Sequence, residues 1–184
     1  MQRVILACGL LLCLTLSTLR AEAPVVVAGK TVATMMKYSR DDIIQKISNT
    51  ASAYNIDPET ALANAEVESN FNPNVSLYEP KFNTYSIGLF QMFLPTARAY
   101  GFKGTLQKLK DPHTNIRLGL MHLNKCVTRF GQDVKKIACC HNAGIAVKEK
   151  VCVNNQGVIN YTRKVVDSYN RWKIRSNMYP VVQL

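Results

Sequence analysis

The spacing of apolar residues predicts a chain that is mainly helical. Apolar positions recur every three or four residues, the period of a helix with one buried face, over about 43–54, 111–130, 134–143 and 158–175. Ser39 or Asp41 could cap the first of these helices, and Asp111 followed by Pro112 is a typical start for the second. We expect this second helix to be the longest and to end at Gly131.

A further predicted helix, rich in alanine, begins at Asp57 and carries the first candidate for chemistry, Glu68. Because residues three, four and seven positions apart share a helix face, one face contains Ala61, Asn64, Ala65 and Glu68. Glu66 lies at roughly 160° from Glu68 around the helix and points away from that face. Burial among small residues would favour the protonated form of Glu68, which a general acid needs. Taken alone, Glu68 would more often be a surface residue.

Four more motifs follow the Glu68-Ser69 pair. They are Gly88-Leu89-Phe90-Gln91 with Thr96-Ala97, Leu109-x-Asp111-Pro112-x-x-Asn115-Ile116-x-x-Gly119-x-x-x-Leu123, His141-Asn142-Ala143-Gly144, and Tyr161-x-Arg163-Lys164-Val165. Each motif alone is unspecific. Together, in this order and at this spacing, they resemble the soluble lytic transglycosylase family, the lysozyme-like enzymes that cut the glycan strands of peptidoglycan. The resemblance runs from about Ile43 to Trp172.

This resemblance implies an α+β fold that is predominantly α-helical. We expect a lysozyme-like domain over residues 40–176, with a small irregular or β wing beside the active-site cleft. The wing would lie in segment 74–86, which is several residues longer here than is usual in the family. The segment carries Tyr78, Phe82 and Tyr85, whose rings could stack on sugar faces or pack the segment onto the body of the domain.

The resemblance also implies the residues of the site. Glu68 would be the catalytic residue, and the substrate-binding residues would be Ser69, Gly88, Leu89, Phe90, Gln91, His141, Asn142 and Tyr161. Gly88 would provide a turn that brings Gln91 close to the substrate. Helical periodicity alone would place Tyr161 in the core. The resemblance implies no metal and no cofactor.

His141 is a departure from the family, which usually has tyrosine at this position. A histidine keeps a planar ring with a hydrogen-bonding edge, and it adds a group that can exchange protons near neutral pH. His141 could do the tyrosine's work, adjust Glu68, mark a weakened enzyme or merely fill the tyrosine's space. The sequence leaves these alternatives open.

The reaction implied by the resemblance needs one carboxyl group. Glu68 would protonate the oxygen of the β-1,4 bond between N-acetylmuramic acid and N-acetylglucosamine. It would then take the proton of the C6 hydroxyl, and a 1,6-anhydromuramic end would form. A hydrolytic lysozyme (muramidase) would use a second carboxylate, for which the inserted segment offers Glu79. The other alternative is a catalytically weakened glycan-binding protein of a wall-crossing machine.

The first 23 residues predict a signal peptide. Arg3 precedes an apolar run from Val4 to Leu16, and Ala21-Glu22-Ala23 is a typical cleavage site. We therefore expect an exported protein, periplasmic or secreted, with an N-terminal extension at 24–39 and a C-terminal tail at 177–184. We expect no stable membrane span after signal cleavage, because no later apolar run is long enough.

Four cysteines remain after signal cleavage: Cys126, Cys139, Cys140 and Cys152. An even number of cysteines in an exported chain predicts disulfides. Cys139 and Cys140 are neighbours on a predicted helix and should not bond to each other, but the pairing is otherwise open. A metal site of Cys139, Cys140 and His141 would require three consecutive helical residues to converge on one ion, so we expect at least one disulfide instead.

The formal charge of +11 indicates an anionic partner. Peptidoglycan qualifies through the carboxylates of its stem peptides. We do not expect nucleic acid as a partner, because the basic residues are scattered and no nucleic-acid-binding motif is present. Small members of the family often serve secretion, conjugation or phage machines, so the resemblance implies such an apparatus as a second class of partner.

Overall fold

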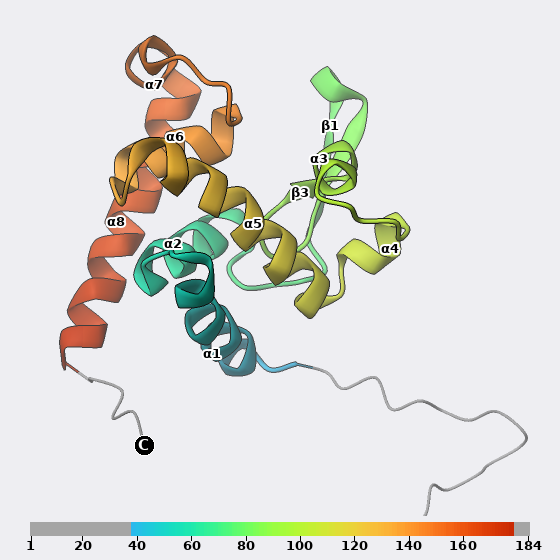
Figure 1. The fold of residues 1–184 in the computed structure, drawn as a ribbon, viewed down its shortest axis with the longest axis horizontal. Coiled ribbons are helices and arrows are strands. Elements are labelled where there is room, and N and C mark those ends of the chain that lie inside the picture. The colour runs from blue at the N-terminus through green and yellow to red at the C-terminus, as the bar shows by residue number, and fades with distance from the viewer. Residues whose placement is uncertain (1–37, 179–184) are drawn as a thin grey trace, which may run out of the picture. The chain divides into compact units, whose positions relative to one another are not determined.

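The computed structural model describes residues 38–178; the predicted signal peptide, residues 24–37 of the extension and residues 179–184 of the tail lie outside this range. Its elements are α1 (Arg40–Ala51), the 3-10 helix η1 (Ser52–Tyr54), α2 (Pro58–Ser69), β1 (Ser76–Glu79), the 3-10 helix η2 (Pro80–Phe82), β2 (Thr84–Ile87), β3 (Met92–Phe93), α3 (Leu94–Ala99), α4 (Leu106–Leu109), α5 (Pro112–Phe130), α6 (Val134–Ala143), α7 (Glu149–Asn154) and α8 (Gln156–Met178). The prediction of a mainly helical α+β fold with a small β wing is confirmed (Figure 1). Within the described range, none of the helices has both the length and the apolar character that crossing a membrane requires.

Side-chain caps set the helix starts that the sequence predicts. Ser39, not Asp41, caps α1: its hydroxyl accepts the N–H of Asp42, and the Asp42 carboxylate accepts the N–H of Ser39. Asp57 and Asp111 cap α2 and α5, and a proline follows each of them. These caps satisfy backbone N–H groups that the first turn of a helix leaves unpaired.

The longest helix in the described range is α8 and not α5, contrary to the expectation. It has 23 residues, against 19 in α5. The Asn155 side chain accepts the N–H of Val158 and so starts the helix earlier than the apolar pattern indicates. At the other end α8 continues through Asn177 and Met178, which we expected in the tail. The added residues are largely polar or exposed, so the period of buried positions does not reveal them.

The central helix of the described domain is α2. It packs against α1 and α8, and every residue from Thr60 to Ala65 is buried. Helix α6 packs against both α5 and α8. In Figure 1 these helices occupy the left and the centre, and the strands lie to the right with α3 and α4. The last turn of α2, which contains Glu68, is only partly buried.

The strands form an antiparallel sheet in the order β1-β2-β3, which is the predicted wing. In the register of β1 and β2, Tyr78 lies opposite Tyr85 and Leu77 lies opposite Ser86. Neighbours along a strand point to opposite faces. Tyr78 and Tyr85 therefore share one face of the sheet, whereas Leu77, Ser86 and Glu79 share the other. The two tyrosine rings are exposed and pair with each other, with centroids 5.2 Å apart.

A tight turn between β2 and β3 is anchored by α5. The Asn115 side chain donates to the carbonyls of Ile87 and Leu109 and accepts the N–H of Phe90. Gly88 has φ +78°, and a Cβ at this position would lie 2.4 Å from Nδ2 of Asn115. Only glycine fits there, because it combines the left-handed backbone with the close approach of Asn115. The predicted turn at Gly88 is therefore confirmed.

Two disulfides connect α6 to its neighbours. Cys126 of α5 bonds to Cys140, and Cys139 bonds to Cys152 of α7. The prediction of at least one disulfide is confirmed, and both adjacent cysteines have partners elsewhere in the chain. Because all four sulfurs form disulfides, they supply no thiolate for the alternative metal site. Such pairing is typical of an oxidising compartment.

Candidate active site

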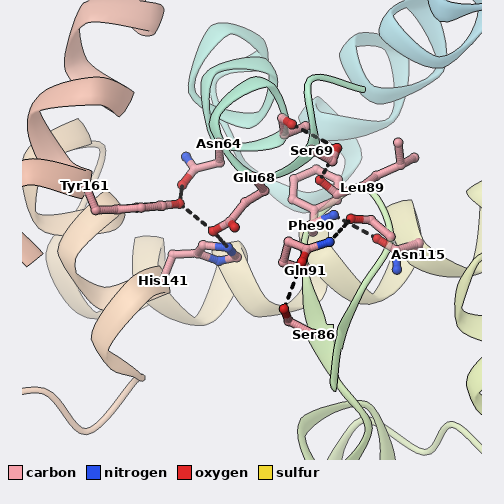
Figure 2. Close-up of polar contacts among 12 residues, drawn as sticks. Asn64, Glu68, Ser69, Ser86, Leu89, Phe90, Gln91, Asn115, His141 and Tyr161 are labelled. Atoms are coloured by element: carbon pink, nitrogen blue, oxygen red, sulfur yellow. Dashed lines mark hydrogen bonds and ion pairs between the residues drawn. The ribbon is translucent and has the colours of Figure 1, made fainter. Parts of the chain in front are cut away.

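Glu68, at the C-terminal end of α2, is contacted by side chains from two other helices (Figure 2). The Tyr161 hydroxyl of α8 donates to Oε1 of Glu68 at 2.7 Å, and Nε2 of His141 from α6 lies 3.0 Å from the same oxygen. The Tyr161 oxygen also lies 3.3 Å from Oδ1 of Asn64, one helical turn before Glu68. The Glu68 side chain is 15% exposed, so it is largely shielded but still open on one side.

Both contacts occupy Oε1 of Glu68. Burial, followed by the negative charge of Glu68, raises the pKa of Tyr161 well above its ordinary value, so its hydroxyl stays protonated and remains a donor. Oε1 therefore accepts at least one hydrogen bond that holds the carboxyl group in a fixed orientation. The other oxygen, Oε2, makes no hydrogen bond within residues 38–178. A proton carried by Glu68 is best placed on Oε2.

His141 is almost fully enclosed, with a side chain that is 5% exposed. Its Nδ1 atom is buried and has no hydrogen-bond partner within the described range. An orphaned buried acceptor is less costly than an orphaned N–H. This difference favours the tautomer with the proton on Nε2, which lets His141 donate to Glu68 as Tyr161 does. The two rings are nearly parallel, with centroids 6.4 Å apart.

His122 of α5 is a buried neighbour of the site that sequence reasoning missed. Its ring meets that of His141 edge to face at 5.2 Å, and its Nδ1 lies 2.9 Å from the Tyr100 hydroxyl. Burial, and then the electrostatic effect of the neighbouring His141, lower the pKa of His122 to about 3, so His122 is neutral near pH 7. The apolar stripe of α5 does not include His122. Its spacing, three residues after Gly119 and four before Cys126, is the signal that could have placed it on one face of α5 with them.

A cleft with a cavity of about 680 Å³ opens beside Glu68. This volume lies within the range of typical ligand sites. Its walls come from the end of α2, the wing, the turn after β2 and the facing sides of α6 and α8. The predicted site residues that line it are Glu68, Phe90, Gln91, His141, Asn142 and Tyr161. Four of the five motifs therefore contribute named residues to the cavity, and the Leu109–Leu123 motif supports it through Asn115, which anchors the turn.

Three of the predicted substrate-binding residues, Ser69, Gly88 and Leu89, do not line the cavity. The Ser69 hydroxyl lies 3.0 Å from the Leu89 carbonyl oxygen and donates to it, which ties the end of α2 to the turn. The Leu89 side chain is completely buried. These residues hold the turn in position, and Gln91 at its end reaches the cleft.

The Gln91 side chain is held by the protein on both sides of its amide. Its oxygen accepts from the Ser86 hydroxyl at 2.8 Å, and its nitrogen donates to the Gly88 carbonyl at 2.7 Å. Such pairing fixes the amide at the wall of the cleft. Gln91 therefore links the wing to the turn.

The aromatic residues of the wing divide between its two faces. Phe82 lines the cavity, where its ring lies 5.4 Å from that of Phe93. Tyr78 and Tyr85 lie on the opposite face of the β1–β2 pair. Of the rings that we considered for stacking on sugars, only Phe82 is placed at the cleft.

Glu79, the second carboxylate that we considered, also lines the cavity. Its Oε1 lies 3.2 Å from the Ser86 hydroxyl. Ser86 has one proton and is closer to Gln91, so Glu79 receives at most a weak hydrogen bond from it. A second carboxyl group therefore stands in the same cleft as Glu68.

Glu66 points away from the cleft, as predicted. It forms an ion pair with Arg171 at 3.1 Å and accepts a hydrogen bond from Ser168, both on α8. Arg40 lies 3.8 Å from its other oxygen. Glu66 thus joins α2 to α8 and to α1, and it takes no part in the cleft.

Fold and cleft together define a lysozyme-like domain with a partly buried glutamate in its cleft. The family model described as the transglycosylase SLT domain matches residues 45–170, and the chain belongs to this family.

Solved structures agree on the fold. The 70-kDa soluble lytic transglycosylase of Escherichia coli matches with a TM-score of 0.58 and 23% sequence identity, over 73% of this chain and 24% of that one. The complex of the 70-kDa soluble lytic transglycosylase with bulgecin A matches over the same shares, with 23% identity and a TM-score of 0.55. The match thus spans 24% of the length of those chains.

Proposed function

We propose that this protein is a peptidoglycan lytic transglycosylase. It cleaves the β-1,4 bond between N-acetylmuramic acid and N-acetylglucosamine and leaves a 1,6-anhydromuramic end. The observation that carries the proposal is the arrangement of Glu68: one oxygen is held by Tyr161 and His141, and the residue lines a cleft large enough for sugars. Membership of the transglycosylase SLT domain family supports the same reaction class.

In the first step, Glu68 acts as the general acid. Its Oε2 proton goes to the glycosidic oxygen, and the bond from that oxygen to C1 of muramic acid breaks. The N-acetyl group at C2 of the same sugar stabilises the positive charge that develops at C1. Tyr161 stabilises the new carboxylate, because its hydroxyl already donates to Oε1.

In the second step, the Glu68 carboxylate acts as the base. It takes the proton of the C6 hydroxyl, and the C6 oxygen bonds to C1 to close the anhydro ring. Glu68 is protonated again, and no water is consumed. One carboxyl group thus completes both steps.

Among the alternatives for His141, the geometry favours a positioning residue. His141 contacts Oε1 of Glu68. A hydrogen-bond donor at this position would orient the carboxyl group of the acid. The unpaired Nδ1 supports a functional reason for the imidazole, because a residue that only filled the space would be better apolar. Asn142 and Phe90, which also line the cavity, remain our candidates for binding the sugars, with Gln91 beside them.

The setting of the reaction follows from its substrate. We propose that the protein is exported and acts on glycan strands in the periplasm or outside the cell, where its two disulfides would be stable. A secretion, conjugation or phage apparatus that must pass the cell wall remains the proposed class of partner.

Product analysis tests the proposal. Sacculi digested with the purified protein should yield muramic ends that are lighter by one water than hydrolytic ends and that resist borohydride reduction. Reducing muramic ends would instead identify a hydrolytic lysozyme. That second candidate is kept because Glu79 lines the same cleft and could activate water. Binding to sacculi without any cleavage would identify a weakened, glycan-binding member of the family.

A further inference from the structure

One face of α8 continues along the cleft beyond Tyr161. Four residues of this helix line the cavity, at the spacing of a single helix face: Gly157, Asn160, Tyr161 and Lys164. Lys164 lies three residues after Tyr161, about 4.5 Å further along the helix axis. It is the only lysine or arginine among the residues that line the cavity in the described range, and it makes no ion pair there.

Asn160 presents a second donor beside Lys164. Its Oδ1 accepts from Arg163 at 3.1 Å and from Gln156 at 2.9 Å. An arginine can only donate, so the atom that Arg163 contacts must be the oxygen of Asn160. The Asn160 amide nitrogen, with its two protons, makes no hydrogen bond within residues 38–178. Asn160 and Lys164 are four residues apart and share the face toward the cleft.

The geometry points to a carboxylate-binding position formed by Asn160 and Lys164 at the margin of the cleft. An ammonium and an amide N–H on adjacent turns match the two oxygens of a carboxylate. Resting on the proposed function, we assign this position to a carboxylate of the stem peptide. The peptide is attached to the muramic acid whose C1 reacts, so its carboxylates would lie close to Tyr161 and Glu68. The position would make the enzyme prefer peptide-bearing strands over bare glycan.

Two variants test the assignment. Lys164→Met removes the charge and keeps most of the length of the unbranched side chain. Asn160→Asp keeps the oxygen that accepts from Arg163 but replaces the donor with a second oxygen. Each is assayed on peptide-bearing glycan strands and on the same strands stripped of peptide by an amidase. The ratio of the two initial rates should fall about threefold to tenfold in each variant.

Lys125→Met is the matched control. Lys125 is an exposed residue of α5 that does not line the cavity, and its replacement removes the same charge. It should leave the ratio of rates unchanged. An unchanged ratio in Lys164→Met and Asn160→Asp, or an equal fall in Lys125→Met, would overturn the assignment.

A binding measurement tests this inference independently of the proposed function. In a Glu68→Gln background, retention on peptide-bearing and on stripped strands is compared with and without Lys164→Met. Cleavage of neither substrate by the unchanged protein would contradict the proposed function. Preferential binding to peptide-bearing strands that Lys164→Met abolishes would still support the carboxylate position, and equal binding to both would overturn it.

Discussion

At the scale of single residues, the site depends on how Glu68 is oriented. Two rings from different helices reach the same oxygen of its carboxyl group, and the other oxygen makes no hydrogen bond to the described part of the chain. The unpaired Nδ1 of His141 costs on the order of 1–3 kcal/mol if no water reaches it. The other ring nitrogen, Nε2, contacts Glu68. This contact is a reason to keep a histidine here despite the cost, and it agrees with the proposed positioning role.

His141→Tyr should therefore keep most of the cleavage activity, because a tyrosine hydroxyl can replace Nε2 as a donor. His141→Ala should lower kcat by about 10²-fold through misplacement of the acid, with a smaller change in KM. Initial rates on purified sacculi check both values, with unfolding measured alongside. Equal rates for all three proteins would show that His141 only fills space.

At the scale of elements, α6 is the most constrained part of the cleft. Cys140 joins it to α5 directly before His141, and Cys139 joins it to α7 on the far side. The two disulfides close loops of similar length, with sequence separations of 14 and 13. Their contributions to stability should be similar, but only the first is anchored next to the site.

Replacing both cysteines of either pair with serine should lower the free energy of unfolding by about 2–5 kcal/mol. Cys126→Ser with Cys140→Ser should also reduce cleavage, because His141 follows Cys140 directly. Cys139→Ser with Cys152→Ser should retain more activity at a temperature where both variants are folded. Denaturant unfolding and sacculus digestion measure the two effects. Equal activities in the two variants would contradict the link between the first disulfide and the site.

Elements were easier to predict than the directions of side chains. The cap at Asp57 and the buried face of α2 gave Glu68 its position from sequence, because helical period and capping are local. Which side chains lie on which face of the wing depends on the register of β1 with β2, and no local pattern in the sequence reveals that register. His122 was missed because helical spacing gives its face on α5 but does not show that this face meets His141 of α6.

At the scale of the whole molecule, a buried neutral histidine links the site to acid stability. Above about pH 6.5, His122 is neutral in both the folded and the unfolded chain. Between about 6.5 and about 3, the unfolded chain binds a proton at this residue and the folded chain does not. The free energy of unfolding therefore decreases as the pH falls through this range, by up to about 1.4 kcal/mol per pH unit from this group.

His122→Asn should remove this contribution. Between pH 6.5 and 4.5, the unchanged protein should lose about 2 kcal/mol more stability than the variant, as measured by denaturant unfolding. His113→Gln, a change at an exposed histidine, is the control and should behave like the unchanged protein. The same pH dependence in His122→Asn would show that this histidine is not the source.

The central claim, that Glu68 is the sole catalytic acid and base, is tested most directly by release of soluble fragments from sacculi. Glu68→Gln keeps the shape of the side chain but cannot transfer the proton, so release should fall by at least about 10²–10⁴-fold while binding persists. Glu66→Gln, which lies on the opposite face of α2, and Glu79→Gln, in the same cleft, are the matched controls and should retain most of the activity. A Glu68→Gln protein that released fragments at the unchanged rate would contradict the account.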